Sequence, residues 1–223
     1  MATVTHEPAR TASRSMAESR VLLPNVSWAL FQEIARARGD RPAPRFTFVD
    51  GALELMRPSY QHESLARLTG LFVMMIARGL GRTCLGAGST LWERAEMEVG
   101  KEPDGCFYLE NEPRIRGLAN VDLDIHPPPD LAIEVEISRP LRDALRVYAA
   151  LGVPEVWRFD GQSLQFLHLE NDGVYRRHAL SRAFPTLREE DAFARLMLGD
   201  TMDQGAWSEE IETWARRELR AKS

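Results

Sequence analysis

The spacing of apolar residues in the first third of the chain predicts two amphipathic helices. In the first, apolar side chains recur at intervals of three and four after Ser27, a suitable N-cap, and the helix should end near Gly39. In the second, one apolar stripe runs over residues 62–78, and Gly79 should stop the helix. The second stripe is expected to pack against a sheet.

Alternating apolar residues and turn residues predict the strands. Residues 46–49 and 52–56 should form a hairpin around a tight type I′ turn at Asp50-Gly51. Residues 85–94 predict a strand with a glycine bend, because they lack the Gly-Lys-Ser/Thr ending of a phosphate loop. Residues 106–109 predict another apolar strand, entered through a Pro-Asp pair.

The second half of the chain predicts a strand, a helix and a strand, followed by an antiparallel meander. The helix after Ser138 carries Leu145 and Tyr148 on one face and should end before Gly152. The strands that follow are expected at residues 153–159, 164–169 and 174–178. A capping box formed by Thr186 and Glu189 predicts a helix through residue 198.

Two glutamates interrupt an apolar strand near the middle of the chain. Asp130, Glu134 and Glu136 share the same parity within this strand and therefore point to one face. Buried carboxylates at this density repel one another and would become protonated unless a cation neutralised them. Oxygen ligands favour a hard ion such as magnesium. The alternative is an edge strand with a solvated acidic face, which gives the same alternation.

Length, charge and cysteine count set limits on these interpretations. The 223 residues contain no apolar run near the roughly 20 that a membrane span needs, so a soluble protein with no membrane partner is expected. The two cysteines give neither a disulfide framework nor a metal-binding quartet, which favours a cytoplasmic location. A net charge of −5 gives no bulk attraction to nucleic acid, so DNA binding would need a local basic patch.

The domain organisation follows from composition and from the last apolar stripe. Residues 1–20 have no apolar periodicity and are predicted to be a disordered tail. Residues 21–200 should form the folded domain, and residues 201–223 a C-terminal amphipathic helix.

Four blocks of the sequence carry a family resemblance. They are Leu53–Ser59 with His62-Glu63, Glu102–Tyr108, Pro129–Ile137 and Tyr148–Arg158. In this order the blocks resemble the Uma-two (Uma2) family of putative restriction endonucleases, and the last block, with Gly-Val-Pro-Glu-Val-Trp, is the most distinctive. The resemblance covers about residues 20–200. It implies a restriction-endonuclease-like fold of the PD-(D/E)XK nuclease superfamily: α/β (mixed α+β), with a central mixed sheet flanked by helices, an N-terminal hairpin and a C-terminal antiparallel meander.

The resemblance also implies a reaction and its residues. The expected chemistry is cleavage of DNA phosphodiester bonds that depends on Mg²⁺ or Mn²⁺. The superfamily's Pro-Asp aspartate falls on Asp104, and the acidic residue that opens its Asp/Glu-x-Lys element falls on Glu134. Together with Glu136, these residues are the expected catalytic and metal-binding carboxylates. His62 and Glu63 could complete an outer shell or simply cap a helix.

The lysine of the superfamily element is displaced in this chain. Glu136 occupies its usual position, and Ala144 occupies the helical position where many family members have a lysine. Lys101 and Lys222 are the only lysines, so Lys101 is a candidate catalytic residue. Three arginines are further candidates, although an arginine stays protonated and is a poor general base: Arg94, Arg142 and Arg146.

Two function classes follow. The first is a metal-dependent DNA endonuclease, which the retained carboxylates favour. The second is a catalytically weak or inactive module of the same fold that binds nucleic acid or a protein partner, which the displaced lysine favours. A homodimer is compatible with either class.

Overall fold

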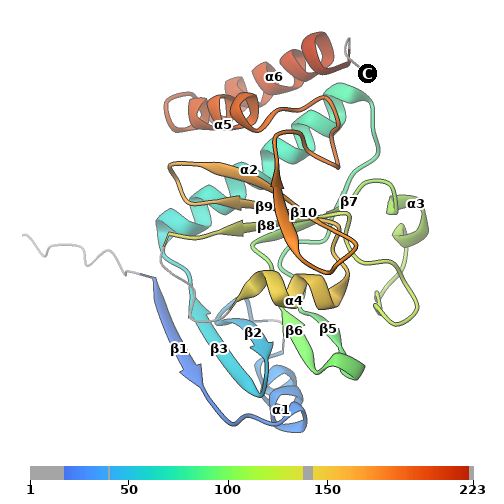
Figure 1. Cartoon of the computed structure of the whole chain (residues 1–223). Coiled ribbons are helices and arrows are strands. Elements are labelled where there is room, and N and C mark those ends of the chain that lie inside the picture. The colour runs from blue at the N-terminus through green and yellow to red at the C-terminus, as the bar shows by residue number, and fades with distance from the viewer. Residues whose placement is uncertain (1–17, 40, 138–142, 221–223) are drawn as a thin grey trace, which may run out of the picture.

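The computed structural model describes residues 18–39, 41–137 and 143–220, which form two β-sheets and helices around them (Figure 1). The six-stranded sheet has the order β11 (Tyr175–His178), β10 (Leu164–Leu169), β9 (Glu155–Phe159), β8 (Leu131–Val135), β7 (Gly105–Tyr108) and β4 (Leu85–Gly86). The five-stranded sheet has the order β1 (Ser19–Leu23), β3 (Ala52–Arg57), β2 (Arg45–Val49), β6 (Val99–Lys101) and β5 (Trp92–Arg94). The expected mixed α+β fold is confirmed, and the N-terminal hairpin belongs to a second sheet.

The helices form layers around the two sheets. They are α1 (Trp28–Arg38), α2 (Tyr60–Leu80), α3 (Glu112–Ile115), α4 (Ala144–Leu151), α5 (Glu189–Met197) and α6 (Gln204–Trp214), with a π-helical continuation of α6 over Ala215–Leu219. In Figure 1, α2 covers one face of the six-stranded sheet, α5 lies beside it against β10, and α6 packs on α2. Helix α4 covers the other face and packs against β2, β5 and β6 of the second sheet. The core is therefore divided by the six-stranded sheet.

Local sequence signals predicted several elements correctly. The Ser27 hydroxyl accepts a hydrogen bond from the Leu30 amide at 3.2 Å and caps α1, which ends at Gly39. In the β2–β3 hairpin, Asp50 and Gly51 both have positive φ, at 50° and 66°, as a type I′ turn requires. The strand–helix–strand unit and the meander are also confirmed, because β8 and β9 pair in parallel while β9, β10 and β11 pair antiparallel.

The prediction that Gly79 stops the second helix is wrong. Helix α2 runs to Leu80 and is capped by Gly81, whose φ of 71° lies in the left-handed region. Gly79 is buried against α6, and a Cβ on it would lie 2.5 Å from the carbonyl oxygen of Glu212. This glycine therefore serves close helix packing, which a local pattern does not distinguish from a helix end.

Two other local predictions are also corrected. Residues 85–94 form two short strands, β4 and β5, in different sheets instead of one bent strand. The capping box of Thr186 and Glu189 does not form, because the N-cap of α5 is Arg188 and its side chain makes no cap hydrogen bond. The Glu189 carboxylate instead accepts hydrogen bonds from Arg177 and from the Phe166 amide.

The predicted N-terminal tail, residues 1–20, falls mostly outside the described residues. Its last positions are described, and Ser19 and Arg20 begin β1, which pairs antiparallel with β3. At the other end, α6 packs on α2 and contributes Trp207, Ile211 and Trp214 to the main core. Within the part of the chain that the structure describes, no helix has the length and apolarity to cross a membrane.

Both cysteines are expected to be unreactive in the folded protein. Burial raises the pKa of Cys84 to about 11 and that of Cys106 to about 12, so neither forms much thiolate near neutral pH. Mass spectrometry after iodoacetamide treatment at about pH 7.5 should find almost no alkylation in native buffer and complete alkylation in urea. Rapid native alkylation of Cys106 would contradict its burial.

Candidate active site

The candidate active site lies where the chain crosses from one sheet to the other. Strand β6 ends at Lys101 in the five-stranded sheet, and β7 begins at Gly105 in the six-stranded sheet. Gly105 pairs with Ile133 of the antiparallel neighbour β8, and the Asp104 amide donates to the Ile133 carbonyl at 3.1 Å. This register places Asp104 beside Glu134. Residues 102–104 thus bring Lys101 and Asp104 to the same end of β8.

Glu134 is held by a lysine and a tyrosine. The Lys101 ammonium lies 2.9 Å from Glu134 Oε1 and also donates to the Glu102 carbonyl at 3.0 Å. The Tyr148 hydroxyl, from α4, donates to the same Oε1. Burial raises the pKa of Tyr148 well above its usual value, with the charge of Glu134 adding to the effect, so the hydroxyl keeps its proton. Both contacts fall on one oxygen of Glu134 and orient the carboxylate.

Asp104 is engaged by protein donors on both of its oxygens. Oδ1 accepts a hydrogen bond from Arg45 of β2 and lies 2.8 Å from Nε2 of His62. Oδ2 accepts a hydrogen bond from the Val135 amide at 2.6 Å. The charge of Asp104 is therefore balanced inside the protein.

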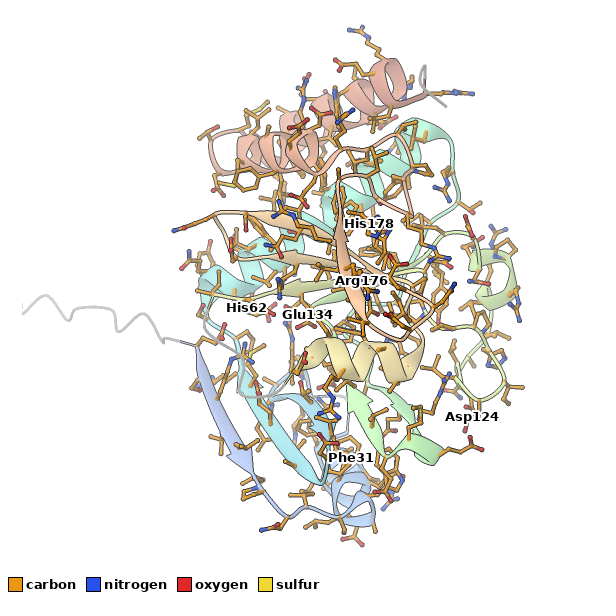
Figure 2. All side chains as sticks on the ribbon, viewed as in Figure 1. Phe31, His62, Asp124, Glu134, Arg176 and His178 are labelled. Carbon is orange, nitrogen blue, oxygen red and sulfur yellow. The ribbon has the colours of Figure 1, made fainter. Side chains whose placement is uncertain are left out.

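His62 and Glu63, predicted as an outer shell, lie next to Asp104 at the start of α2. His62 is fully buried, and its Nδ1 lies 2.7 Å from Oε2 of Glu18. Glu63 accepts a hydrogen bond from Arg45 at 2.7 Å. Ser59 rather than either residue caps α2, since its hydroxyl accepts from the His62 amide. Figure 2 shows His62 and Glu134 in the same region of the molecule, far from Asp124.

Glu136 follows β8 directly and is half-buried. Burial raises the pKa of its carboxyl; Arg158 opposes this effect and the charge of Glu134 reinforces it. Among the described residues, no side chain makes a hydrogen bond to the Glu136 carboxylate, whereas Arg158 donates to Gln165. A half-buried carboxylate with few donors beside a second carboxylate is a place where a cation would be stabilising.

The structure brings Glu134 and Glu136 together but does not gather all three predicted carboxylates as metal ligands. Within the described ranges, no cluster of three or more histidine, cysteine or acidic side chains is arranged to hold a metal ion. Asp104 faces Arg45 and His62 instead. Magnesium, however, is commonly bound by one or two carboxylates together with water and substrate phosphates. Lys101 and Tyr148 both contact Oε1 of Glu134, and no described side chain donates to Glu136, whereas both oxygens of Asp104 are occupied by other donors.

Three contacts of this site were not predicted from the sequence, namely those of Arg45, Tyr148 and Glu18. Arg45 begins a strand that has no other charged residue, which was an available sequence signal, and it is 7% exposed in the structure. For Tyr148 the sequence predicts only a place on an apolar helix face. Of the arginines considered as substitutes for the lysine, Arg94 donates to two backbone carbonyls and Arg146 pairs with a surface aspartate. Arg142 lies outside the described residues.

Asp130, which shares the parity of the two glutamates, lies at the opposite end of β8. Its carboxylate accepts hydrogen bonds from the Leu109 amide at 2.6 Å and from both the backbone and side chain of Asn111. Asp130 therefore fixes a turn and does not add charge to the site.

A comparison with protein families decides the classification. The sequence profile of the Uma2 family, described as putative restriction endonucleases, matches residues 28–199. The chain belongs to the Uma2 family. The resemblance found in the four sequence blocks is thereby confirmed, and the matched region contains every residue of the candidate active site described above except Glu18. No functionally curated protein matches the chain.

The most distinctive Uma2 block of this chain has a structural role. Glu155 begins β9 and is fully buried. Its carboxylate accepts hydrogen bonds from Trp157 Nε1 at 3.0 Å, from Ser181 Oγ at 3.2 Å, and from the Arg182 and Ala183 amides at 3.1 and 2.7 Å. The glutamate of Gly-Val-Pro-Glu-Val-Trp thus fixes the turn at residues 181–183 and is not part of the candidate active site.

Proposed function

We propose that this Uma2 protein is a metal-dependent endonuclease that hydrolyses phosphodiester bonds in DNA. Family membership supports a nuclease. The observation that carries the proposal is the 2.9 Å contact between Lys101 and Glu134, because it supplies a lysine to the acidic strand from a neighbouring sheet. Glu136 stands at the position that the superfamily pattern gives to lysine, and Lys101 would take over the role of that lysine from β6.

The proposed cation is Mg²⁺ or Mn²⁺, and Glu134 and Glu136 would hold it. When bound, it would polarise a phosphoryl oxygen and lower the pKa of a coordinated water. Tyr148 and Lys101 hold Oε1 of Glu134, which leaves Oε2 for this role. Asp104 would orient the end of β8 through the Val135 amide.

The chain's own groups could bind a phosphate oxygen and accept the proton of the attacking water. Lys101 uses two of its three N–H donors on Glu134 and the Glu102 carbonyl, and the third is the donor it offers to a phosphate oxygen. Glu136 would hold the cation through one carboxylate oxygen, and its second oxygen would accept the proton of the attacking water. Water would add to phosphorus, its proton would pass to Glu136, one P–O ester bond would break, and the leaving oxygen would be protonated from solvent.

Replacing Glu136 with glutamine tests the proposal. The change removes one charge and almost no volume, so calorimetric binding of Mg²⁺ or Mn²⁺ and nicking of supercoiled plasmid should be lost together. The matched control is Asp124→Asn, which removes a carboxylate from an exposed loop away from the site and should leave both unchanged. A wild-type protein that is folded yet neither binds the cation nor nicks DNA would contradict the proposal.

The same variant has an expected pH dependence. A carboxyl group whose pKa is raised on folding stabilises the protein at low pH, and that stability is lost as the pH rises through the folded-state pKa. Without metal, Glu136→Gln should therefore melt near the wild-type temperature at about pH 4 and above it at about pH 7. Calorimetric scans at both pH values measure the difference. A variant that is less stable at neutral pH would show that Glu136 has a stabilising partner.

One observation favours a second candidate function. Arg45 and His62 already engage Asp104, which a nuclease of this superfamily would use in catalysis. A module that binds DNA without cleaving it would retain this arrangement. DNA binding by the wild-type protein with no nicking in either cation would favour this alternative.

A further inference from the structure

A groove of about 320 Å³ opens beside Asp104, between α2 and the edge of the six-stranded sheet. One wall is a single face of α2 that runs from Glu63 to Met74, with lining residues three and four positions apart. The other wall is formed by Gly86 and Gly88 at the end of β4 and by residues 104–107 at the start of β7. The groove is separate from the contacts of Lys101 with Glu134 but shares Asp104 with the site.

Glycines keep this groove open. Four of its lining residues have no side chain: Gly70, Gly86, Gly88 and Gly105. A Cβ on Gly70 would lie 3.5 Å from the Phe107 ring, and a Cβ on Gly86 would lie 3.4 Å from the same ring. Larger side chains at these positions would fill the space beside the ring. The groove is thus lined by backbone at four positions and by the edge of the nearly buried Phe107 ring.

Charged groups gather at the Asp104 end of the groove. The Arg45 guanidinium links Asp104 to Glu63, and the Glu63 side chain is 43% exposed and can accept further hydrogen bonds. Arg67 is exposed one helical turn along the same wall. The groove thus offers apolar walls, the carboxylate of Glu63 as an acceptor and the guanidinium of Arg67 as a cation. A nucleotide has the matching features: a flat apolar base, N–H donors on its edge and an anionic phosphate.

We propose that the groove binds one unpaired nucleobase of a DNA strand whose phosphate lies beside Lys101 and Glu134. The protein would therefore prefer single-stranded or locally melted DNA to an intact duplex. This inference rests on the proposed function. A base can enter the groove only when it has left its stack, because both faces of a stacked base are covered. Glu63 would then accept from the edge of the base, while Arg67 would contact the adjoining phosphate.

Binding measurements without divalent cation test the inference separately from cleavage. Fluorescence anisotropy in EDTA would compare a labelled single strand of about 12 nucleotides with the duplex of the same sequence. The wild-type protein should bind the single strand more tightly. Gly70→Leu, which places a large side chain in the groove, should weaken single-strand binding about tenfold and leave duplex binding unchanged.

Two further variants keep the result interpretable. Ser64→Leu adds the same side chain at an exposed position of α2 outside the groove and should bind as the wild type does. Arg67→Gln changes an exposed side chain, carries little risk to folding, and should also weaken single-strand binding. Equal affinity for both DNA forms, or wild-type binding by Gly70→Leu and Arg67→Gln, would overturn the inference. A failure of nicking alone would overturn the proposed hydrolysis and leave the groove result intact.

Discussion

Replacing Lys101 with methionine is expected to abolish DNA cleavage and to lower the free energy of unfolding by about 3–5 kcal/mol. Lys101 and Glu134 are 6% and 7% exposed, so removing the ammonium leaves a carboxylate in a poorly solvated position. Tyr148 still donates to that carboxylate but carries no compensating charge. Urea unfolding and plasmid nicking measure the two effects.

A compensating variant separates the two consequences. Adding Glu134→Gln to Lys101→Met removes the uncompensated charge while keeping an oxygen for Tyr148, so much of the lost stability should return. Nicking should stay absent, because both groups of the proposed catalytic pair are gone. If the single Lys101→Met variant were as stable as the wild type and still nicked plasmid, neither the buried pair nor the catalytic role of Lys101 would hold.

Replacing Glu155 with alanine should cost about 3–5 kcal/mol of unfolding free energy, without any role for this residue in catalysis. The substitution removes the acceptor for Trp157 Nε1 and for the Arg182 and Ala183 amides. Each buried donor left without a partner costs on the order of 1–3 kcal/mol. Specific activity per folded molecule should be unchanged, which distinguishes Glu155 from Lys101.

Glu170→Ala is the matched control for this substitution. Glu170 pairs with His178 at the surface, where the two side chains are 37% and 42% exposed, and such pairs contribute about 0–1 kcal/mol. Thermal melts of both variants should therefore differ clearly. Similar melting temperatures for Glu155→Ala and the wild type would mean that water replaces the lost acceptor.

The sequence predicted those parts of the fold that are specified locally. The Ser27 cap, the Asp50-Gly51 turn and the alternation in the meander each depend on residues close together in the chain. Gly79 was misassigned because its requirement comes from α6, more than a hundred residues later. Likewise, periodicity within residues 85–94 does not show that β4 and β5 pair with strands of different sheets.

The candidate site was predicted only in part, for a similar reason. Strand parity and the family motif placed Glu134, Glu136 and Asp104 near one another. The orientation of Asp104 depends on Arg45, which comes from a strand of the other sheet. The contact of Lys101 with Glu134 depends on the crossing between sheets at residues 102–104. Such distant contacts are decided by how the sheets dock and leave no periodic signal.

The crossing at residues 102–104 also makes the proposed DNA cleavage depend on the docking of the two sheets. Lys101 belongs to one sheet and Glu134 to the other, so the proposed catalytic pair exists only in molecules whose sheets are docked. Native proteins open in sub-global units whose free energies range from near zero to the full unfolding free energy. A form that released the five-stranded sheet would keep Glu134 and Tyr148 but lose the lysine. If the proposed function is right, cleavage would then stop while most of the six-stranded sheet was still folded, and the loss of nicking would report the separation of the two sheets.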